Sequence, residues 1–390
     1  MHRSRVPSLF RCRGYLPGQL NRERPTLAPY LRMASMATSS SLGALIASFL
    51  FQSWRAHAPS SQIREEELAA IIPLLTSSGA SALANARIRD SHLRDSTTAA
   101  QLQQAHRLHA VHAAAFEEDI TSVITLLRNA GVEPILAKGW AVARLYPDTS
   151  LRPYGDIDLY VPPGQYSSAM RVLASSEGKR FVVDLHEGFD SSEGISIDAL
   201  YERSRLVSLA DVKVRVPCDE DHLRILCLHF LRHGAWRPLW LCDIAVAVET
   251  RAPEFDWDIC LGTNPRRADW VACSIGLAHR LLGAEIAGTP VVDRAQTLPA
   301  WLISNVLKQW ETPYSMSQPP VNYAAPMSKY LRDPRGFLSD LRRRWPNAIE
   351  ATVYTGGPFN DLPRWPFQIG ECMIRTGKFL ARTLRPDRDD

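Results

Sequence analysis

Apolar residues recur at three- and four-residue spacing through most of the first third of the chain, which is the period of an α-helix. The pattern is clearest in REEELAAIIPLLTSSG and AAQLQQAHRLHAVHAAAFEEDITSVITLLRNAG, and Gly131 then follows where a glycine commonly ends a helix. The apolar run at residues 42–51 is too short to cross a bilayer, so we interpret it as a first amphipathic helix. Residues 41–130 are therefore predicted to form an N-terminal helical region.

The period changes after Gly131. The stretches VEPILAKG, GDIDLYV and RFVVDLHEG each predict a short strand, and the last two alternate polar and apolar residues. Two predicted helices lie between them: WAVARLYP, which Pro147 closes, and QYSSAMRVLASS. This order of strand, helix, strand, helix and strand predicts a small mixed α/β unit, which we place at residues 131–216.

Helical periodicity returns after Pro217. The stretches DEDHLRILCLHFLRHG, PLWLCDIAVAVET, DWVACSIGLAHRLLGA and AWLISNVLKQWE predict a helical region over residues 217–310. Residues 311–390 form an extension rich in Pro and Arg, with a last helix near GECMIRTGKFLART. The predicted fold class is thus α+β, with a small mixed sheet flanked by N- and C-terminal helical regions.

Charge is unevenly distributed along the chain. Residues 1–32 contain seven arginines and one glutamate and carry +6, so with a net charge of +4 the remaining residues carry −2. We interpret residues 1–40 as a disordered arm, a targeting segment, or a mis-started stretch whose true first residue is Met33 or Met36. The nearly neutral body argues against long nucleic acid as a partner.

Cysteine usage indicates a reducing compartment. The seven cysteines form no C-x-x-C pair, and most lie within apolar helical pattern, as reduced core residues of a cytoplasmic protein do. The apolar fraction of 45% and the charged fraction of 22% are also those of a soluble globular protein without a transmembrane segment.

Two aspartates, Asp156 and Asp158, stand one residue apart in the predicted strand GDIDLYV. The spacing alone is weak evidence, because D-x-D occurs at three further places, beside predicted helix starts or in a polar tail. Within a strand, however, residues two apart project to the same face. Two carboxylates about 4 Å apart repel by about 4 kcal/mol at an effective dielectric near 20, so a partly buried pair needs a cation or a proton.

Asp184, in the next predicted strand, offers a third carboxylate. Three carboxylates suit Mg²⁺, a hard ion that prefers oxygen ligands, and we also consider Mn²⁺. The segment LAKGW ends a strand at Gly139, where the N–H groups of a helix start and the charge of Lys138 would cradle phosphate. These residues together predict a phosphoryl- or nucleotidyl-transfer site with two metal ions and an NTP substrate. The alternative is a solvated acidic turn beside an ordinary strand–helix connection.

The run ILAKGWAVARLYPDTSLRPYGDIDLYV resembles the signature of the uncharacterised nucleotidyltransferase family within the DNA polymerase β-like superfamily. Downstream, LCLHFLRHGAWRPLWLCDIAVAVE is similar to the family's helical region, with His229, His233, Trp236 and Asp243 in the expected order. The likeness covers roughly residues 60–290. The family's KG, YP, RP, DIDL and DLH motifs stand here as Lys138-Gly139, Tyr146-Pro147, Arg152-Pro153, Asp156 to Leu159 and Asp184-Leu185-His186.

The resemblance implies a polymerase β-like core in which Asp156 and Asp158 are metal ligands. It implies Asp184 as the third ligand and as a base for the incoming hydroxyl, and a contact between Gly139 and the nucleotide phosphates. Trp140 is a departure from the pattern, because the wider superfamily usually has a small residue, often Ser, after this glycine.

Several other polar residues have two interpretations. Arg152 has the fork of donors that suits phosphate, or it anchors the loop before the strand. His186 shares a strand face with Asp184 and is assigned to substrate or nucleotide binding. His229 and His233 have the i, i+4 spacing of zinc ligands, but no glutamate follows the first histidine, so we interpret them as lining or buttressing a cleft.

Two further groups are interpreted as structural. His106, His109 and His112 recur every third residue on a predicted helix, as expected for a partly exposed helix face rather than a metal site. Asp198 rivals Asp184 as a third acid, but its place before ALYERSRL is typical of a helix cap.

The predicted function is transfer of an NMP from an NTP to a hydroxyl or phosphate of an unidentified acceptor by two-metal catalysis. The nearly neutral body favours a small molecule, a peptide or a protein as the acceptor over long nucleic acid. Two alternatives stay open: a catalytically weak relative that acts as a binding or regulatory module, and a hydrolase or phosphotransferase that uses the same acids.

Overall fold

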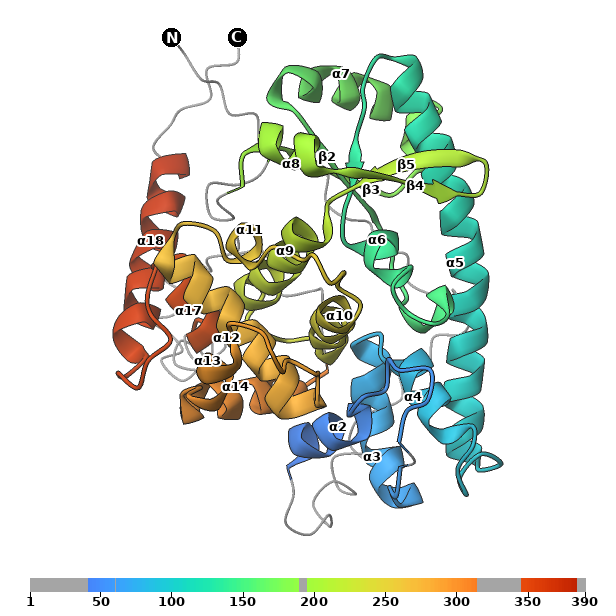
Figure 1. The fold of residues 1–390 in the computed structure, drawn as a ribbon, viewed down its shortest axis with the longest axis vertical. Helices are drawn as coiled ribbons and strands as arrows, with labels where there is room; N and C mark the ends of the chain where they lie inside the picture. Colours follow the sequence, from blue (N-terminus) through green and yellow to red (C-terminus); the bar gives the residue numbers. More distant parts are fainter. Residues whose placement is uncertain (1–40, 60, 189–194, 314–344, 384–390) are drawn as a thin grey trace, which may run out of the picture.

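The computed structural model describes residues 41–59, 61–188, 195–313 and 345–383, in which helices surround one small sheet (Figure 1). The predicted arm at residues 1–40 lies outside the described residues. The sheet lies in the upper part of Figure 1, beside the long helix α5, and most other helices lie below it. The described elements are α2 (Leu42–Leu50), α3 (Glu65–Ser77), α4 (Ser81–Ile88), α5 (Thr97–Asn129), β1 (Ile135–Leu136), α6 (Gly139–Ala143), η1 (Thr149–Leu151), β2 (Ile157–Val161), α7 (Pro163–Leu173), η2 (Gly178–Arg180), β3 (Val183–Glu187), α8 (Ile197–Arg203), β4 (Arg205–Leu209), β5 (Val212–Val216), α9 (Asp219–Arg232), α10 (Pro238–Glu249), α11 (Trp257–Leu261), α12 (Pro265–Leu282), α13 (Val292–Gln296), α14 (Ala300–Trp310), α17 (Ala348–Tyr354) and α18 (Trp365–Thr383).

Five strands form one mixed sheet in the order β3–β2–β1–β5–β4. β2 pairs parallel with β3 and antiparallel with β1, whereas β5 pairs parallel with β1 and antiparallel with β4. β1, β2 and β3 are the three strands that the sequence predicts, and the predicted helices between them are present as α6 and α7. The protein therefore has a mixed α+β architecture.

The hairpin of β4 and β5 is missing from the sequence prediction. VKVRV alternates as a strand should, but Leu209 pairs with Val212 across a two-residue turn formed by Ala210 and Asp211. Ala210 has a φ of +48°, a left-handed conformation that glycine or asparagine usually provides in such turns. The turn therefore carries no clear sequence signal, and its position became evident only from strand pairing.

Alternation along β2 gives its two faces different neighbours. Ile157, Leu159 and Val161 belong to a hydrophobic cluster with the second half of α5. Tyr160 belongs instead to a smaller cluster that includes residues of α8 and α9. Asp158 is two residues from Tyr160 in the strand, so it shares this second face, toward α9.

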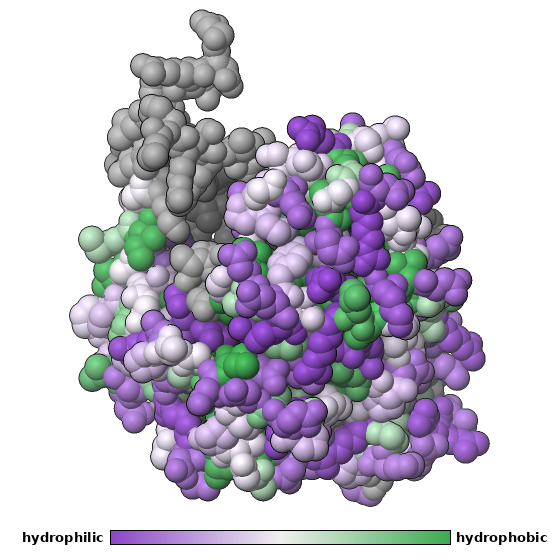
Figure 2. All heavy atoms as spheres, turned by 45° about the horizontal axis from the view of Figure 1, so that its top comes forward, coloured by the Kyte–Doolittle hydropathy of each residue, from purple (hydrophilic) through white to green (hydrophobic). Residues whose placement is uncertain are grey.

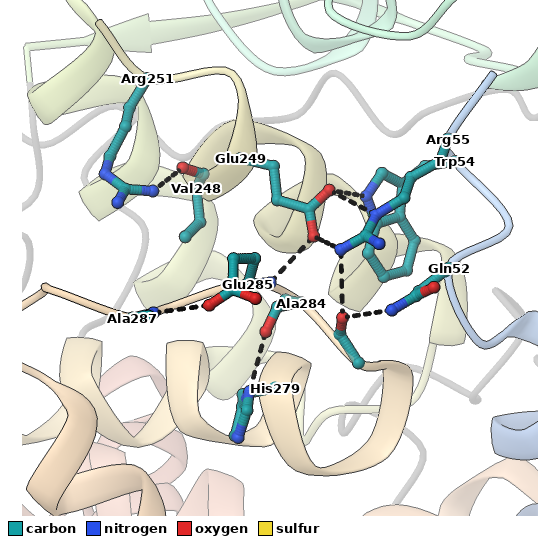
Figure 3. A network of polar contacts seen from close by, with 11 residues as sticks. Gln52, Trp54, Arg55, Val248, Glu249, Arg251, His279, Ala284, Glu285 and Ala287 are labelled. Atoms are coloured by element: carbon teal, nitrogen blue, oxygen red, sulfur yellow. Dashed lines mark hydrogen bonds and ion pairs between the residues drawn. The ribbon is translucent and has the colours of Figure 1, made fainter. Parts of the chain in front are cut away.

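The helical regions on either side of the sheet share one hydrophobic core, which takes residues from α2 to α5 and from α9 to α14. Polar contacts join them as well. Glu249 at the end of α10 accepts hydrogen bonds from Trp54 Nε1 (2.9 Å) and Arg55 Nε (3.0 Å), both just after α2 (Figure 3). The segments predicted separately at residues 41–130 and 217–310 thus build one helical body.

Apolar side chains are scattered over the surface shown in Figure 2, where hydrophilic residues predominate and apolar ones form small separate groups. Within the described ranges, no helix has the length and apolar character needed to cross a membrane. Of the seven cysteines, six lie in these ranges; all six are free thiols and five are buried, in keeping with the predicted core positions. α18 occupies the stretch where the sequence predicts a terminal helix.

Candidate functional site

Asp158 and Asp184 lie opposite each other on the neighbouring parallel strands β2 and β3. Parallel strands paired in register place the side chains of opposite residues on the same face of the sheet. Asp158 is buried, whereas the Asp184 side chain is 41% exposed, so the pair runs from the protein interior to solvent. The structure therefore brings together two of the three predicted carboxylates.

Two basic side chains contact these carboxylates. The ammonium group of Lys138 forms an ion pair with Asp158 Oδ1. His186 Nε2 lies 3.4 Å from Asp158 Oδ1 and 3.2 Å from Asp184 Oδ2, and its ring stacks on Tyr160 with the centroids 4.4 Å apart. The positive charge that two converging carboxylates require is thus supplied by the chain itself.

The pKa values of the cluster follow from these contacts. Burial would lower the pKa of His186, but the hydrogen bonds to Asp158 and Asp184 outweigh it and raise that pKa to about 9. Burial would also lower the pKa of Lys138, yet the charge of Asp158 raises it above its ordinary value. The hydrogen bond from His186 lowers the pKa of Asp184, and Lys138 overcomes burial to lower that of Asp158. At neutral pH the cluster therefore holds two cations and two anions.

Asp156 stands one residue before β2 and is set apart from this cluster. In the part of the chain that the structure describes, ligand atoms of Asp158, Asp184 and His186 lie within 4.8 Å of one another, and Asp156 is outside this group. Burial, and then the charge of Asp158, raise the pKa of Asp156 to about 6. Asp156 is therefore electrostatically coupled to the cluster, while a histidine completes the group of three.

The donor set fits a divalent cation through its carboxylates. Oxygens of Asp158 and Asp184 suit Mg²⁺ or Mn²⁺, whereas the imidazole of His186 suits Mn²⁺ better than Mg²⁺. Metal ligands must be deprotonated, so His186 would have to lose its proton and Lys138 would have to leave Asp158.

The turn at Lys138 and Gly139 has an unusual backbone. Lys138 has φ +52° and ψ −138°, and Gly139 has φ +25°. Such conformations are uncommon for a residue with a side chain and concentrate at functional sites. Trp140, the residue after this glycine, is buried in the cluster shared with α5 and donates from Nε1 to Glu117 (3.2 Å). The bulky side chain is therefore accommodated in the core.

Arg152 is buried and engaged away from the acid cluster. Its Nη2 lies 2.7 Å from Asp243 Oδ2 in α10, and its Nε lies 3.1 Å from both oxygens of the same carboxylate. Tyr146 donates a hydrogen bond of 2.8 Å to Asp243 as well. This geometry matches the interpretation of Arg152 as an anchor of the loop before β2. The predicted contact with phosphate would require this buried ion pair to open.

His229 and His233 lie one turn apart at the C-terminal end of α9. Their ring centroids are 4.4 Å apart, and both rings contact Trp240 of α10, at 4.6 and 5.3 Å. Burial, and then the charge of Lys138, lower the pKa of both histidines, which places them near the acid cluster. Two aromatic residues of this region, Trp240 and Tyr160, were not singled out as candidates from the sequence. The second could have been found, because it stands two residues after Asp158 on the same strand face.

The remaining predicted residues have structural surroundings. His106 lies 2.8 Å from Ser150 Oγ and 3.0 Å from Asn85 Nδ2, and so links α5 to its neighbours. His112 is exposed, in keeping with a partly exposed helix face. Asp198 lies in the first turn of α8 rather than at its cap, which is Ser196.

A family comparison agrees with the site. The family model described as uncharacterised nucleotidyltransferase matches residues 64–180 and 174–283, which together make up more than half of the chain. These regions include both carboxylates of the cluster, the turn before α6, and α9 and α10. The chain therefore belongs to this family of uncharacterised nucleotidyltransferases. No curated protein and no solved structure matches the chain.

Proposed function

We propose that the protein transfers a nucleoside monophosphate from an NTP to a hydroxyl or phosphate of a small-molecule, peptide or protein acceptor, on a polymerase β-like core. The observation that supports this most is the in-register pairing of Asp158 with Asp184 beside Lys138 and Gly139. In the reaction, the acceptor oxygen forms a bond to the α-phosphorus and the bond to the bridging oxygen breaks. Pyrophosphate leaves, and the acceptor's proton passes to a base.

The residues divide into three tasks. Asp158 and Asp184 would hold Mg²⁺ or Mn²⁺, with Asp156 as the third predicted ligand. When bound, such ions polarise the phosphate and lower the pKa of the attacking hydroxyl. Lys138 and the turn at Gly139 would contact the phosphates, and His186 would bind substrate.

Two acids could take the acceptor's proton, Asp184 and Asp156. An efficient base has a pKa near the working pH, and the pKa of Asp156 is raised to about 6. The pKa of Asp184, the base that the family pattern implies, is instead lowered by its hydrogen bond from His186. The lowering of the Asp184 pKa depends on the contact with protonated His186, which metal binding would end, so we keep Asp184 as the proposed base.

The test is incubation of the protein with each labelled NTP, Mg²⁺ or Mn²⁺, and a cell extract. We expect the wild type to label an extract component and Asp156→Ala/Asp158→Ala to lose this transfer. The matched control is Asp90→Ala/Asp95→Ala, which removes two carboxylates that are 89% and 85% exposed between α4 and α5. Transfer that is absent with both metals, or equal in the wild type and the site variant, would contradict the proposal.

The ion pair of Lys138 with Asp158 favours a second function. The lysine ammonium already neutralises Asp158, at the place where a metal ion would act. A protein in which lysine replaces the metal would bind a nucleotide without transferring it, as a binding or regulatory module.

Nucleotide titrations of Lys138→Met separate the two functions. If the lysine replaces the metal, the wild type binds NTP without divalent cations and the variant loses this binding. If the protein is a transferase, nucleotide binding requires Mg²⁺ or Mn²⁺, and the variant binds Mn²⁺ more tightly because Asp158 is released.

A further inference from the structure

A cavity of about 510 Å³, partly open to solvent, is lined by residues of α2, α4, α12 and α14. In Figure 1 these helices lie below the sheet. Its volume is in the range of ligand pockets, roughly 300–1,000 Å³. The apolar part of its wall includes Phe51, Leu281 and Leu307, from the segment after α2 and from α12 and α14. Two arginines, Arg87 of α4 and Arg280 of α12, also line it, and none of its described lining residues is acidic. The cavity is therefore positively charged and partly apolar.

Arg87 is the residue that points to a ligand. It is only 8% exposed, although its side chain is a permanent cation. Its Nε donates to the carbonyl of Phe49 (3.0 Å), but Nη1 is buried without a hydrogen-bond partner among the described residues. Burial lowers the pKa of this guanidinium, and none of the acids in the described ranges offsets the effect. A buried charge in this state is costly unless something else supplies the opposite charge.

The contact with Phe49 gives Arg87 a structural role, because a cation near the C-terminal end of a helix such as α2 is favourable. That role uses one of the five N–H donors of the guanidinium. Arg152 shows what a matched buried arginine looks like in this protein, with Asp243 accepting from both its Nε and its Nη2. Arg87 thus corresponds to one half of an ion pair whose other half is not found among the described residues.

We propose that this cavity binds an amphipathic anion, whose carboxylate or phosphate group pairs with Arg87 and whose apolar part lies against Phe51, Leu281 and Leu307. The exposed Arg280 adds a second positive charge. The sign of the charge selects against cationic ligands. The apolar wall favours an anion with a hydrocarbon body over a bare inorganic ion.

Calorimetric titration with ten-carbon probes tests the ligand class. Decanoate, decyl phosphate, decanol and decylammonium share one chain and differ in the head group, and each is used below the concentration at which it forms micelles. We expect decanoate or decyl phosphate to bind at least about tenfold more tightly than decanol, as a charge-assisted pair predicts. The tighter anion identifies the head group. Equal binding of all four probes, or binding of inorganic phosphate as tight as that of decyl phosphate, would overturn the proposal.

Arg87→Met tests the residue, because it removes the charge and keeps a long apolar side chain. We expect anion affinity to fall at least about tenfold, while the Tm without ligand stays the same or rises because an unpaired buried charge is gone. Arg89→Met, at a side chain that is 63% exposed, is the matched control and should bind like the wild type. A purely structural arginine would give the reverse result: a lower Tm and unchanged affinity for the anion.

A second variant keeps the test independent of Arg87. Ala44 of α2 lines the same cavity, so Ala44→Phe narrows it without removing a charge. We expect this variant to lose binding of the ten-carbon anion. Unchanged binding would place the ligand elsewhere and contradict the proposal.

Discussion

Lys138 and Asp158 form a buried ion pair that connects the turn before α6 to the first half of β2. Their side chains are only 10% and 7% exposed. A buried pair of this kind contributes little net stability, but each charge depends on the other, because removing one leaves the second uncompensated in the protein interior. The pair also joins the two parts of the candidate site, the turn expected to hold phosphate and the strand that carries the acids.

The first prediction is a strong energetic coupling between these two residues. Asp158→Asn or Lys138→Met alone should reduce the free energy of unfolding by about 3–5 kcal/mol, and the double variant should recover most of that loss. Urea unfolding of the four proteins measures the coupling. The same cycle at Arg64 and Glu67, a solvent-exposed ion pair at the N-terminus of α3, should give a much smaller coupling. Additive losses at Lys138 and Asp158 would contradict the buried pair.

The second prediction separates the two interpretations of Arg152. Because Asp243 is fully buried, Arg152→Met should leave an unpaired carboxylate and reduce the free energy of unfolding by about 3–5 kcal/mol. Arg152→Lys should lose the bidentate contact and be destabilised to a smaller extent. Unfolding curves and nucleotide titrations are compared for each variant. A loss of nucleotide affinity at unchanged stability would instead support the predicted contact with phosphate.

The third prediction concerns the glycine of the turn. A Cβ at Gly139 would meet only ordinary contacts, at 3.5 Å from the Asp156 carbonyl oxygen and farther from other atoms, so the strain of Gly139→Ala comes from its positive φ. We expect a loss of about 1–2 kcal/mol in stability together with weaker nucleotide binding. Gly131→Ala is the matched control, because Gly131 has φ +75° and open space around it at the end of α5. It should lose similar stability and keep nucleotide affinity.

The fourth prediction is acid sensitivity caused by His222. Burial lowers the pKa of this histidine to about 3, and its Nε2 has no hydrogen-bond partner among the described residues. The unfolded chain takes up the proton below about pH 6.5, whereas the folded protein does not do so until about pH 3. His222 therefore does not reduce the free energy of unfolding above pH 6.5. As the pH falls below this value the free energy of unfolding decreases, by about 2 kcal/mol at pH 5.

His222→Leu should reduce the loss of stability between pH 7 and pH 4 without loss of stability at pH 7. The buried His229 and His233, whose pKa values are also lowered, should keep the remaining loss. Urea unfolding at several pH values between 7 and 4 measures the free energy of unfolding of each protein. His57→Leu, at an exposed position, removes a surface histidine and serves as the control. Parallel pH profiles of stability for the wild type and His222→Leu would rule out a contribution from His222.

The directions of the side chains along β2 are a feature that could be predicted from the sequence. The alternation in GDIDLYV predicted that Asp158 and the apolar residues Ile157 and Leu159 face opposite ways, and the structure agrees. This worked because side-chain direction along a strand is a local property with a period of two. The hairpin of β4 and β5 was not predicted, because Ala210, at its turn, gives no comparable local signal.

The amino-acid sequence by itself determined the helical and strand periods, the family membership and the acids of the candidate site. Only the tertiary structure decided which charges meet: Lys138 with Asp158, His186 with both Asp158 and Asp184, and Arg152 with Asp243, 91 positions away. It also showed that Arg87 is buried beside a cavity and has no acidic partner in the part of the chain that the structure describes. The physical reason is that periodicity depends on neighbouring residues, whereas charge compensation depends on distance and burial, which are set by the packing of segments far apart in the chain.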